Sequence, residues 1–251
     1  MIFISFYLTA YSLNFDEKCT LMSNDTDTIN TCENCPDRKE SMFGSLCSEK
    51  VIGIDAVKTC SFYNKNEPLF SERTTPRGVF FISTGKVKIF ALGEEGKEQI
   101  IQIAVEGDLV GFRAMFNEEL YKVSATALED CNICFIGKED FLQLVDENTT
   151  LKNGIMKALS SELAERATFV TKMAQKTVRE RLAYSLLILE KVYKRDPINL
   201  SREDLANFVG TATETVIRLL KEYKMENLVK TKGRKIVIID RGSLSKVAGF
   251  I

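Results

Sequence analysis

The stretch "LSREDLANFVGTATETVIRLLKEYK", residues 200–224, has the pattern of two short helices separated by a tight turn. Ser201, followed three residues later by Asp204, resembles a capping box and predicts the start of the first helix. Gly210 predicts the turn, because glycine adopts backbone angles that other residues avoid. The apolar residues that recur with helical spacing predict the buried faces of the two helices: Leu205, Phe208, Val209, Val216, Leu219, Leu220 and Tyr223.

Two helices joined in this way form a helix-turn-helix, whose second helix enters the major groove of DNA. Downstream, "VKTKGRKIVIID" (229–240) predicts a hairpin with a basic turn around Gly233, which is the wing of a winged helix. Residues 171–251 contain 17 Lys/Arg against 9 Asp/Glu, whereas the rest of the chain contains 17 against 26. This asymmetry is expected where only the C-terminal part meets a polyanion.

The preceding part of the chain has different periodicities. Between residues 78 and 141, short apolar runs alternate with glycine-containing turns, which predicts a small antiparallel barrel or sandwich. In the run "KVKIFALG" we expect Val87 and Ile89 on one face and Phe90 on the other. Helical spacing follows in residues 151–178, with a narrow apolar stripe at Met156, Leu159, Leu163, Val170 and Met173. Such a stripe predicts a long helix that pairs with a copy of itself, or one that packs on its own β domain.

A β-roll, a long helix and a winged helix-turn-helix in this order resemble the Crp–Fnr superfamily of bacterial transcription regulators. The resemblance is clearest in residues 85–112 and 200–224. It implies an α+β fold with an N-terminal antiparallel β-roll of the cyclic-nucleotide-binding kind, a long dimerisation helix and a C-terminal winged helix-turn-helix. It also implies a homodimer that binds a palindromic operator in double-stranded DNA and works with RNA polymerase. The expected divisions are a cysteine-containing segment (31–50), the β-roll sensor (51–145), the dimerisation helix (146–175) and the DNA-binding domain (176–251).

The resemblance further implies which side chains meet DNA. In this family a Glu and an Arg four residues later read bases from the second helix, and here these are Glu214 and Arg218. Arg can donate two hydrogen bonds to guanine and Glu can accept one from cytosine, whereas an ion pair between the two on a solvated face is the alternative. Thr213 and Ile217 complete the base-reading set, the isoleucine through a thymine methyl group. The predicted phosphate contacts are Thr211, Thr215, Lys221, Lys232, Arg234 and Lys235.

The best-known effector of the family is cyclic AMP, and this sequence departs from the pattern that binds it. The family's Glu for the ribose and Arg for the phosphate are replaced by Phe112 and Val123. Lys122 lies one position away, but neighbouring residues of a strand point to opposite faces. Because a buried phosphate without a cation is strongly disfavoured, we do not expect cyclic AMP binding.

The segments "GDLVGF" (107–112) and "ALE" (127–129) resemble the Fnr branch instead, several members of which sense oxygen with a [4Fe–4S] cluster. The ligands that this resemblance implies are Cys32, Cys35, Cys47 and Cys134. Eleven residues separate Cys35 from Cys47, more than the branch usually leaves between its second and third ligands. Closing the longer loop costs only about half a kcal/mol more.

Three alternatives to the cluster stay open. Cys32 and Cys35 suit a dithiol switch, and the set of four cysteines also suits a structural zinc. In the third alternative there is no thiol chemistry, and Cys60, Cys131 and Cys134 are buried as small apolar residues. The regulator would then respond to another small ligand or act constitutively.

Composition excludes several other classes of protein. The 251 residues include no histidine, which excludes histidine-dependent protease triads, HExxH zinc sites and histidine-ligated haem. No nucleophile–base pair, P-loop or dinucleotide fingerprint indicates an enzyme, although a small-molecule-binding barrel without DNA function is the alternative class. Seven scattered cysteines in a chain that needs no disulfides predict a reducing, cytoplasmic location.

The apolar start of the chain, residues 1–15, is too short to span a bilayer, so we expect no membrane association. We expect residues 1–21 to be an over-extension of the reading frame upstream of Met22. The alternative is that residues 1–30 form a disordered tail outside the fold.

Overall fold

The computed structural model describes residues 54–117, 119–194 and 196–250, and it confirms the α+β class. The strands are β1 (Lys58–Tyr63), β2 (Pro68–Phe70), β3 (Gly78–Thr84), β4 (Val87–Leu92), β5 (Glu98–Ala104), β6 (Leu109–Val110), β7 (Ser124–Ala127), β8 (Cys131–Gly137), β9 (Ile198–Asn199), β10 (Val229–Lys232) and β11 (Lys235–Ile238). The helices are the 3₁₀ helix η2 (Phe112–Met115) and the α-helices α2 (Lys138–Asp146), α3 (Thr149–Gln175), α4 (Val178–Val192), α5 (Arg202–Val209), α6 (Thr213–Met225) and α7 (Arg241–Val247).

Eight strands form the β-roll as two antiparallel sheets, with strand orders β1-β8-β3-β6 and β2-β7-β4-β5. Aromatic rings fill the space between the sheets. Phe70 stacks on Tyr121 with ring centroids 4.0 Å apart, and Phe80 lies 5.6 Å from Phe70 and 5.1 Å from Phe135. Closely packed rings of this kind contribute beyond the apolar area that they bury. Burial raises the pKa of the Tyr121 hydroxyl to about 12, and this hydroxyl donates to the carbonyl of Gly78.

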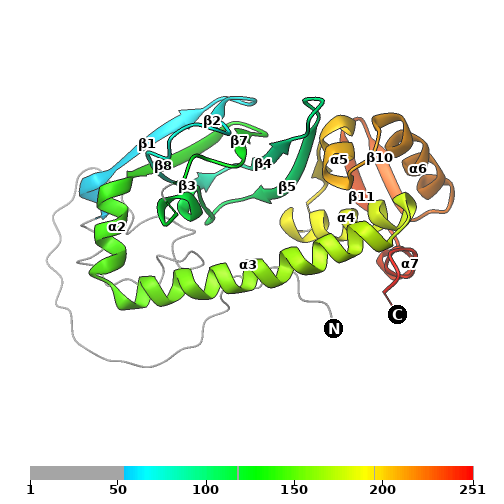
Figure 1. Ribbon diagram of the computed structural model, residues 1–251. Helices are drawn as coiled ribbons and strands as arrows, with labels where there is room; N and C mark the ends of the chain where they lie inside the picture. Colours follow the sequence, from blue (N-terminus) through cyan, green and yellow to red (C-terminus); the bar gives the residue numbers. More distant parts are fainter. Residues whose placement is uncertain (1–53, 118, 195, 251) are drawn as a thin grey trace, which may run out of the picture.

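The long helix α3 extends from the β-roll to the C-terminal domain (Figure 1). Its N-cap is Asn148, whose side-chain oxygen accepts a hydrogen bond from the backbone N–H of Leu151. Leu151 and Ile155 are buried against η2, α2 and the outer face of the β1-β8-β3-β6 sheet. At the other end Phe169 and Met173 pack against the core of the C-terminal domain. The helix therefore contacts both cores.

The C-terminal domain is a winged helix. Helices α4, α5, α6 and α7 share one apolar core with the small antiparallel sheet β10-β11-β9. Thr177 and Glu180 form a reciprocal capping box at the start of α4, which satisfies N–H groups that the first turn leaves free. The predicted hairpin is present, with its turn at Gly233 in the left-handed region (φ 57°).

One predicted face assignment is confirmed and one needs a correction. Val87 and Ile89 point into the β-roll, whereas Phe90 lies on the other face of β4, in the core shared with the C-terminal domain, so the predicted alternation is confirmed. In α3, Leu159 and Met173 pack against the two cores of their own chain rather than lying on the exposed stripe.

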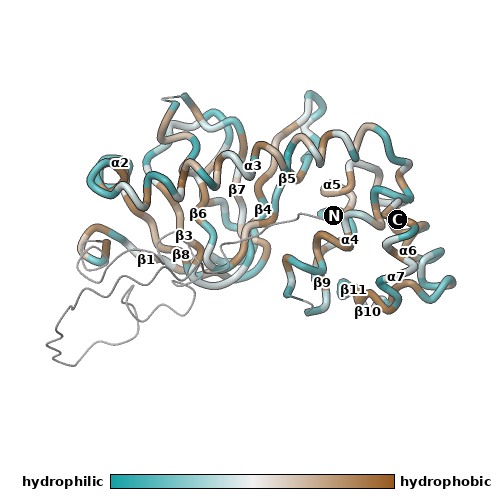
Figure 2. Tube along the Cα trace, turned by 90° about the horizontal axis from the view of Figure 1, so that it is seen from below, coloured by the Kyte–Doolittle hydropathy of each residue, from teal (hydrophilic) through white to brown (hydrophobic). Residues whose placement is uncertain are grey.

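Sequence reasoning did not identify the edge strands β1 and β2 or the helices α2 and α7. Among the described residues, no helix is long and apolar enough to cross a membrane. Figure 2 shows hydrophobic residues recurring at intervals along the trace rather than in one long run.

Candidate DNA-binding interface

The turn between α5 and α6 is built from the residues that predicted it. The Ser201 hydroxyl accepts a hydrogen bond from the backbone N–H of Asp204 at 2.9 Å and so caps α5. Gly210 ends α5 in the left-handed region (φ 73°), where a side chain would be strained. The predicted inward faces of α5 and α6 are confirmed, because all of their apolar members are buried: Leu205, Phe208, Val209, Val216, Leu219, Leu220 and Tyr223.

The opposite face of α6 is open to solvent. Glu214, Ile217, Arg218 and Lys221 are exposed and lie at positions 1, 4, 5 and 8 of one helical face. Ile217 is a large apolar residue, yet 53% of its surface is accessible. Thr213 is half-buried at the start of this face. The structure thus places the four predicted base-reading side chains along one accessible strip.

The arginine of this strip has a partner on its own helix. Arg218 donates to the Glu222 carboxylate at 2.6 Å, so the i,i+4 ion pair runs toward the C-terminus of α6 and does not involve Glu214. Within the described residues Glu214 has no ion pair. Glu222 is also held by Arg179 of α4, at 3.1 Å. Because Arg218 is 64% exposed, its ion pair contributes only a few tenths of a kcal/mol, about 0.3–0.5, and a base can replace Glu222.

The first turn of α6 lacks a side-chain cap. Ala212 occupies the N-cap position and offers no oxygen to the free N–H groups of the first turn. Free N–H groups and the helix dipole favour an anion at this end. Thr211 and Thr215, both half-buried, flank the first turn. This arrangement suits a DNA phosphate, as predicted for these two residues.

The wing carries the remaining predicted phosphate contacts. Lys232, Arg234 and Lys235 are exposed around Gly233. Arg202, the first residue of α5, holds the wing turn by donating to the carbonyls of Gly233 at 2.9 Å and of Arg234 at 3.2 Å. Burial lowers the pKa of the Arg202 guanidinium. The sequence did not predict this positioning role of Arg202. No local pattern indicates that the first residue of a helix contacts a hairpin turn about thirty residues downstream.

The helix-turn-helix is docked on the β-roll through β4 and β5. Lys88 forms ion pairs with Glu98 at 2.5 Å and with Asp204 of α5 at 3.0 Å. Gln99 donates to the carbonyl of Asn207 at 2.7 Å, and Lys97 donates to that of Thr211 at 3.0 Å. A cleft of about 400 Å³ lies between the β4–β5 turn and the start of α6. Its lining includes Thr213 and Glu214, two of the four predicted base-reading residues.

The described residues contain one of the four candidate cluster ligands. Cys134 of β8 is bonded through its sulfur to Cys60 of β1, a disulfide that the sequence did not predict. The other three candidates, Cys32, Cys35 and Cys47, lie outside the described residues. Within the part of the chain that is described, no group of three or more His, Cys, Asp or Glu side chains could hold a metal ion.

The remaining sequence hypotheses on the β-roll concern the burial of single residues. Cys131 is a buried free thiol, as expected for a small apolar residue, and burial raises its pKa. Cys60 is exposed, so the expectation that it is buried is wrong. Phe112, which stands where the family binds ribose, packs in the core against α2 and α3. Val123, which replaces the phosphate-binding Arg, packs beside the interior of the β-roll.

Comparisons with known proteins agree with this architecture. Residues 61–148 match the family model of a cyclic nucleotide-binding domain, and residues 180–247 match that of a Crp-like helix-turn-helix domain. The transcriptional activator protein anr of Pseudomonas aeruginosa is 28% identical over 226 residues, which cover 87% of this chain and 92% of that protein. The fumarate and nitrate reduction regulatory protein of Escherichia coli is 27% identical over 192 residues, 74% of this chain and 76% of that protein.

The structure of FixK2 from Bradyrhizobium japonicum has the same fold. Its TM-score is 0.69 at 23% identity, and the match covers 76% of this chain and 97% of that chain. The β-roll, the helix-turn-helix and the matches to family models and to known regulators lead to one conclusion. The chain belongs to the Crp/Fnr family of transcription regulators, which bind DNA through the helix-turn-helix and are not enzymes.

Proposed function

We propose that the protein is a homodimer that binds a palindromic operator and reads bases with Thr213, Glu214, Ile217 and Arg218. The observation that carries this proposal is the open strip on α6, which combines an unpaired carboxylate, a weakly held guanidinium and an exposed isoleucine beside a basic wing. Ile217 in particular is explained by a thymine methyl group, since water would favour a polar residue there.

Phosphate contacts fix the register of this strip on the duplex. The set comprises Thr211, Thr215, Lys221, Lys232, Arg234 and Lys235. Its members lie at the uncapped start of α6, on the exposed face of α6 and on the wing. Such contacts provide affinity and salt dependence without sequence preference. RNA polymerase is the expected protein partner of the bound dimer.

Dimerisation is supported by the surface of α3. Met156, Leu163 and Val170 are 62%, 72% and 64% exposed and recur every seven residues. Three small, exposed residues, Ser160, Ala167 and Ala174, fall between and after them. The combined spacing of four and three is that of a coiled-coil seam, and the small residues allow close approach of a second helix. To bind a palindromic operator, such a dimer must hold its two copies of α6 about one DNA turn apart, near 34 Å.

The proposed signal is oxygen or redox state, sensed by a [4Fe–4S] cluster on Cys32, Cys35, Cys47 and Cys134. Support comes from the thiol donor set and from the similarity to regulators named for fumarate and nitrate reduction. A sulfur within a disulfide is not a thiolate ligand, so Cys134 can serve only after its bond to Cys60 is reduced. That bond favours the second candidate, a regulator of the same fold without a cluster.

The experiment selects a duplex from a random library with the wild-type protein and measures binding to it and to single-base variants. Glu214→Ala together with Arg218→Ala should remove discrimination at the contacted base pairs, by about 1–3 kcal/mol for each pair. Lys221→Ala is the matched control on the same face, and it should weaken binding to all duplexes alike. Full discrimination in the double variant contradicts the base-reading assignment.

A further inference from the structure

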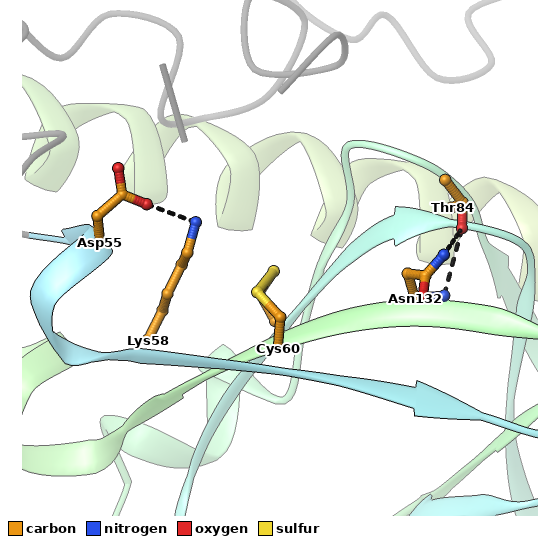
Figure 3. Close-up of a disulfide and its surroundings, with 6 residues drawn as sticks. Asp55, Lys58, Cys60, Thr84 and Asn132 are labelled. Carbon is orange, nitrogen blue, oxygen red and sulfur yellow. Dashed lines mark hydrogen bonds and ion pairs between the residues drawn. A yellow bond between two sulfur atoms is a disulfide. The ribbon is translucent and has the colours of Figure 1, made fainter. Parts of the chain in front are cut away.

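Cys60 and Cys134 are direct partners across two antiparallel strands. The pairing of β1 with β8 sets Cys60 opposite Cys134, with Thr59 opposite Phe135 and Ser61 opposite Ile133. Figure 3 shows Cys60 on β1 with its sulfur bonded, on the same side of the strand as the Asp55–Lys58 ion pair. The two thiols are 74 residues apart in the sequence, so the sheet register alone brings them together.

The two sulfurs have different surroundings. Cys60 lies on an exposed part of β1, where solutes can reach it. Cys134 is half-buried and packs against the apolar cluster that contains Leu151 and Ile155 of α3. One member of the pair can thus exchange with soluble thiols, while the other contacts the core that supports the long helix.

The central part of β1 is exposed. Among the described strands, β1 lies at the edge of its sheet and pairs with β8 alone. Its four central residues, Thr59–Phe62, are all exposed. Backbone hydrogen bonds to β8, the packing of Tyr63 against the core of the β-roll and the bond to Cys134 all hold β1, so making or breaking the disulfide changes how firmly the strand is held.

We propose that Cys60 and Cys134 form a reversible thiol–disulfide pair whose oxidation fixes β1 to β8 and withdraws Cys134 from any ligand role. The oxidant is a low-molecular-weight disulfide. The Cys60 thiolate attacks it and releases one thiol, leaving a mixed disulfide on Cys60. The Cys134 thiolate then attacks the Cys60 sulfur, which releases the second thiol and closes the bond. Two protein thiols are oxidised and one small disulfide is reduced to two thiols.

The second half of this proposal rests on the proposed function. A thiolate bound to iron cannot attack Cys60, so a bound cluster and the Cys60–Cys134 bond exclude one another. Under oxidising conditions the disulfide would therefore hold the Cys134 sulfur, which is one of the ligands that the cluster needs. The first half, the thiol–disulfide pair itself, is independent of iron.

The test uses the full-length protein, reduced and then exposed to oxidised glutathione under nitrogen. Free thiols are blocked with a maleimide, and linked peptides are identified by mass spectrometry. The expected result is a Cys60–Cys134 peptide, which a dithiol reductant removes. Cys60→Ser and Cys134→Ser should each abolish it, and Cys131→Ser, on the opposite face of the same strand, should keep it. Maleimide on both Cys60 and Cys134, or a link from Cys134 to an N-terminal cysteine, overturns the proposal.

A second arm of the experiment tests the exclusion between cluster and disulfide separately from the thiol–disulfide pair itself. The reduced protein is supplied with ferrous iron and sulfide before the same oxidation. Iron uptake with loss of the Cys60–Cys134 peptide supports mutual exclusion, whereas iron uptake with the peptide still formed refutes it. If no iron is taken up but the peptide forms, the proposed cluster fails and the thiol–disulfide pair stands.

Discussion

Replacing Lys88 by methionine should destabilise the docking of the DNA-binding domain on the β-roll. Lys88 is 14% exposed and bridges Glu98, 28% exposed, and Asp204, 20% exposed. Methionine keeps the apolar stem but leaves two carboxylates facing each other at the domain boundary. Exposed ion pairs contribute about 0.2–1 kcal/mol and removing one partner of a buried pair costs about 3–5, so this partly buried triad should lose about 2 kcal/mol.

The assay is urea unfolding followed by far-ultraviolet circular dichroism, because the chain has no tryptophan to report by fluorescence. Lys122→Met is the matched control. Lys122 pairs with Glu119 at 2.6 Å, but the two side chains are 76% and 51% exposed, so less than about 0.5 kcal/mol should be lost. Adding Asp204→Asn to Lys88→Met should recover part of the loss, since one unpaired carboxylate disappears. A loss for Lys88→Met no larger than that for Lys122→Met refutes the reasoning.

The pH dependence of the same variant follows from the pKa of Lys88. Burial opposes its charge, but hydrogen bonds to Glu98 and Asp204 outweigh this and raise the pKa above the ordinary 10.5. A raised pKa adds stability that is complete below the unfolded value and is lost as pH rises through the folded value. The difference between wild type and Lys88→Met should therefore not change through this titration between pH 7 and 9.5, and it should shrink above pH 10.5.

Three further predictions concern the other surfaces. Leu163→Glu should convert a dimer to a monomer in sedimentation without lowering the stability of the monomer, because Leu163 is 72% exposed; a dimer that persists would remove the seam from α3. Glu222→Gln should tighten operator binding several-fold, measured by fluorescence anisotropy, because it releases Arg218 and removes a negative charge; weaker binding would show that Glu222 positions Arg218 for its base. Reducing the Cys60–Cys134 bond should lower the urea stability by up to about 4 kcal/mol for a 74-residue separation, and Cys60→Ser should show no such dependence on reductant.

Features that depend on local sequence were predictable. The cap at Ser201, the left-handed Gly210 and the inward face of α6 follow from residue type and spacing within one or two turns. The open strip from Glu214 to Arg218 follows as the complement of that inward face. Helix periodicity therefore predicted the buried side of α6 and, by exclusion, its solvent-exposed side.

Features that depend on register or on distant partners were not predictable. The burial of Phe90 depends on a distant partner, because the face of β4 that carries it packs against the C-terminal domain. Cys60 and Cys134 meet only because β1 pairs with β8 in one register, and β1 itself is an exposed edge strand with no apolar alternation. The contact between Arg179 of α4 and Glu222 of α6 joins two helices and is likewise not indicated by local sequence.

The contacts of α3 also bear on how a signal at the proposed dimer seam would reach the helix-turn-helix. Phe169 of α3 lies with its ring 6.3 Å from that of Phe208 in α5, so the two helices touch directly. On the β-roll side, Gln102 of β5 accepts from Arg166 of α3 at 3.5 Å, while Gln99 of the same strand donates to α5. Helix α5 is therefore contacted both by α3 and by a strand that α3 also contacts, in addition to the covalent connection through α4.

Coupling through β5 and coupling through the direct contacts of α3 predict different behaviour of the Lys88→Met variant. If β5 carries the coupling, loosening Lys88 should weaken operator binding as well as stability, because α5 would lose its fixed position relative to α3. If the Phe169–Phe208 contact and the α3–α4 connection suffice, Lys88→Met should lower stability and leave operator affinity unchanged. Proximity alone does not decide between these routes, but the two readouts on one variant do.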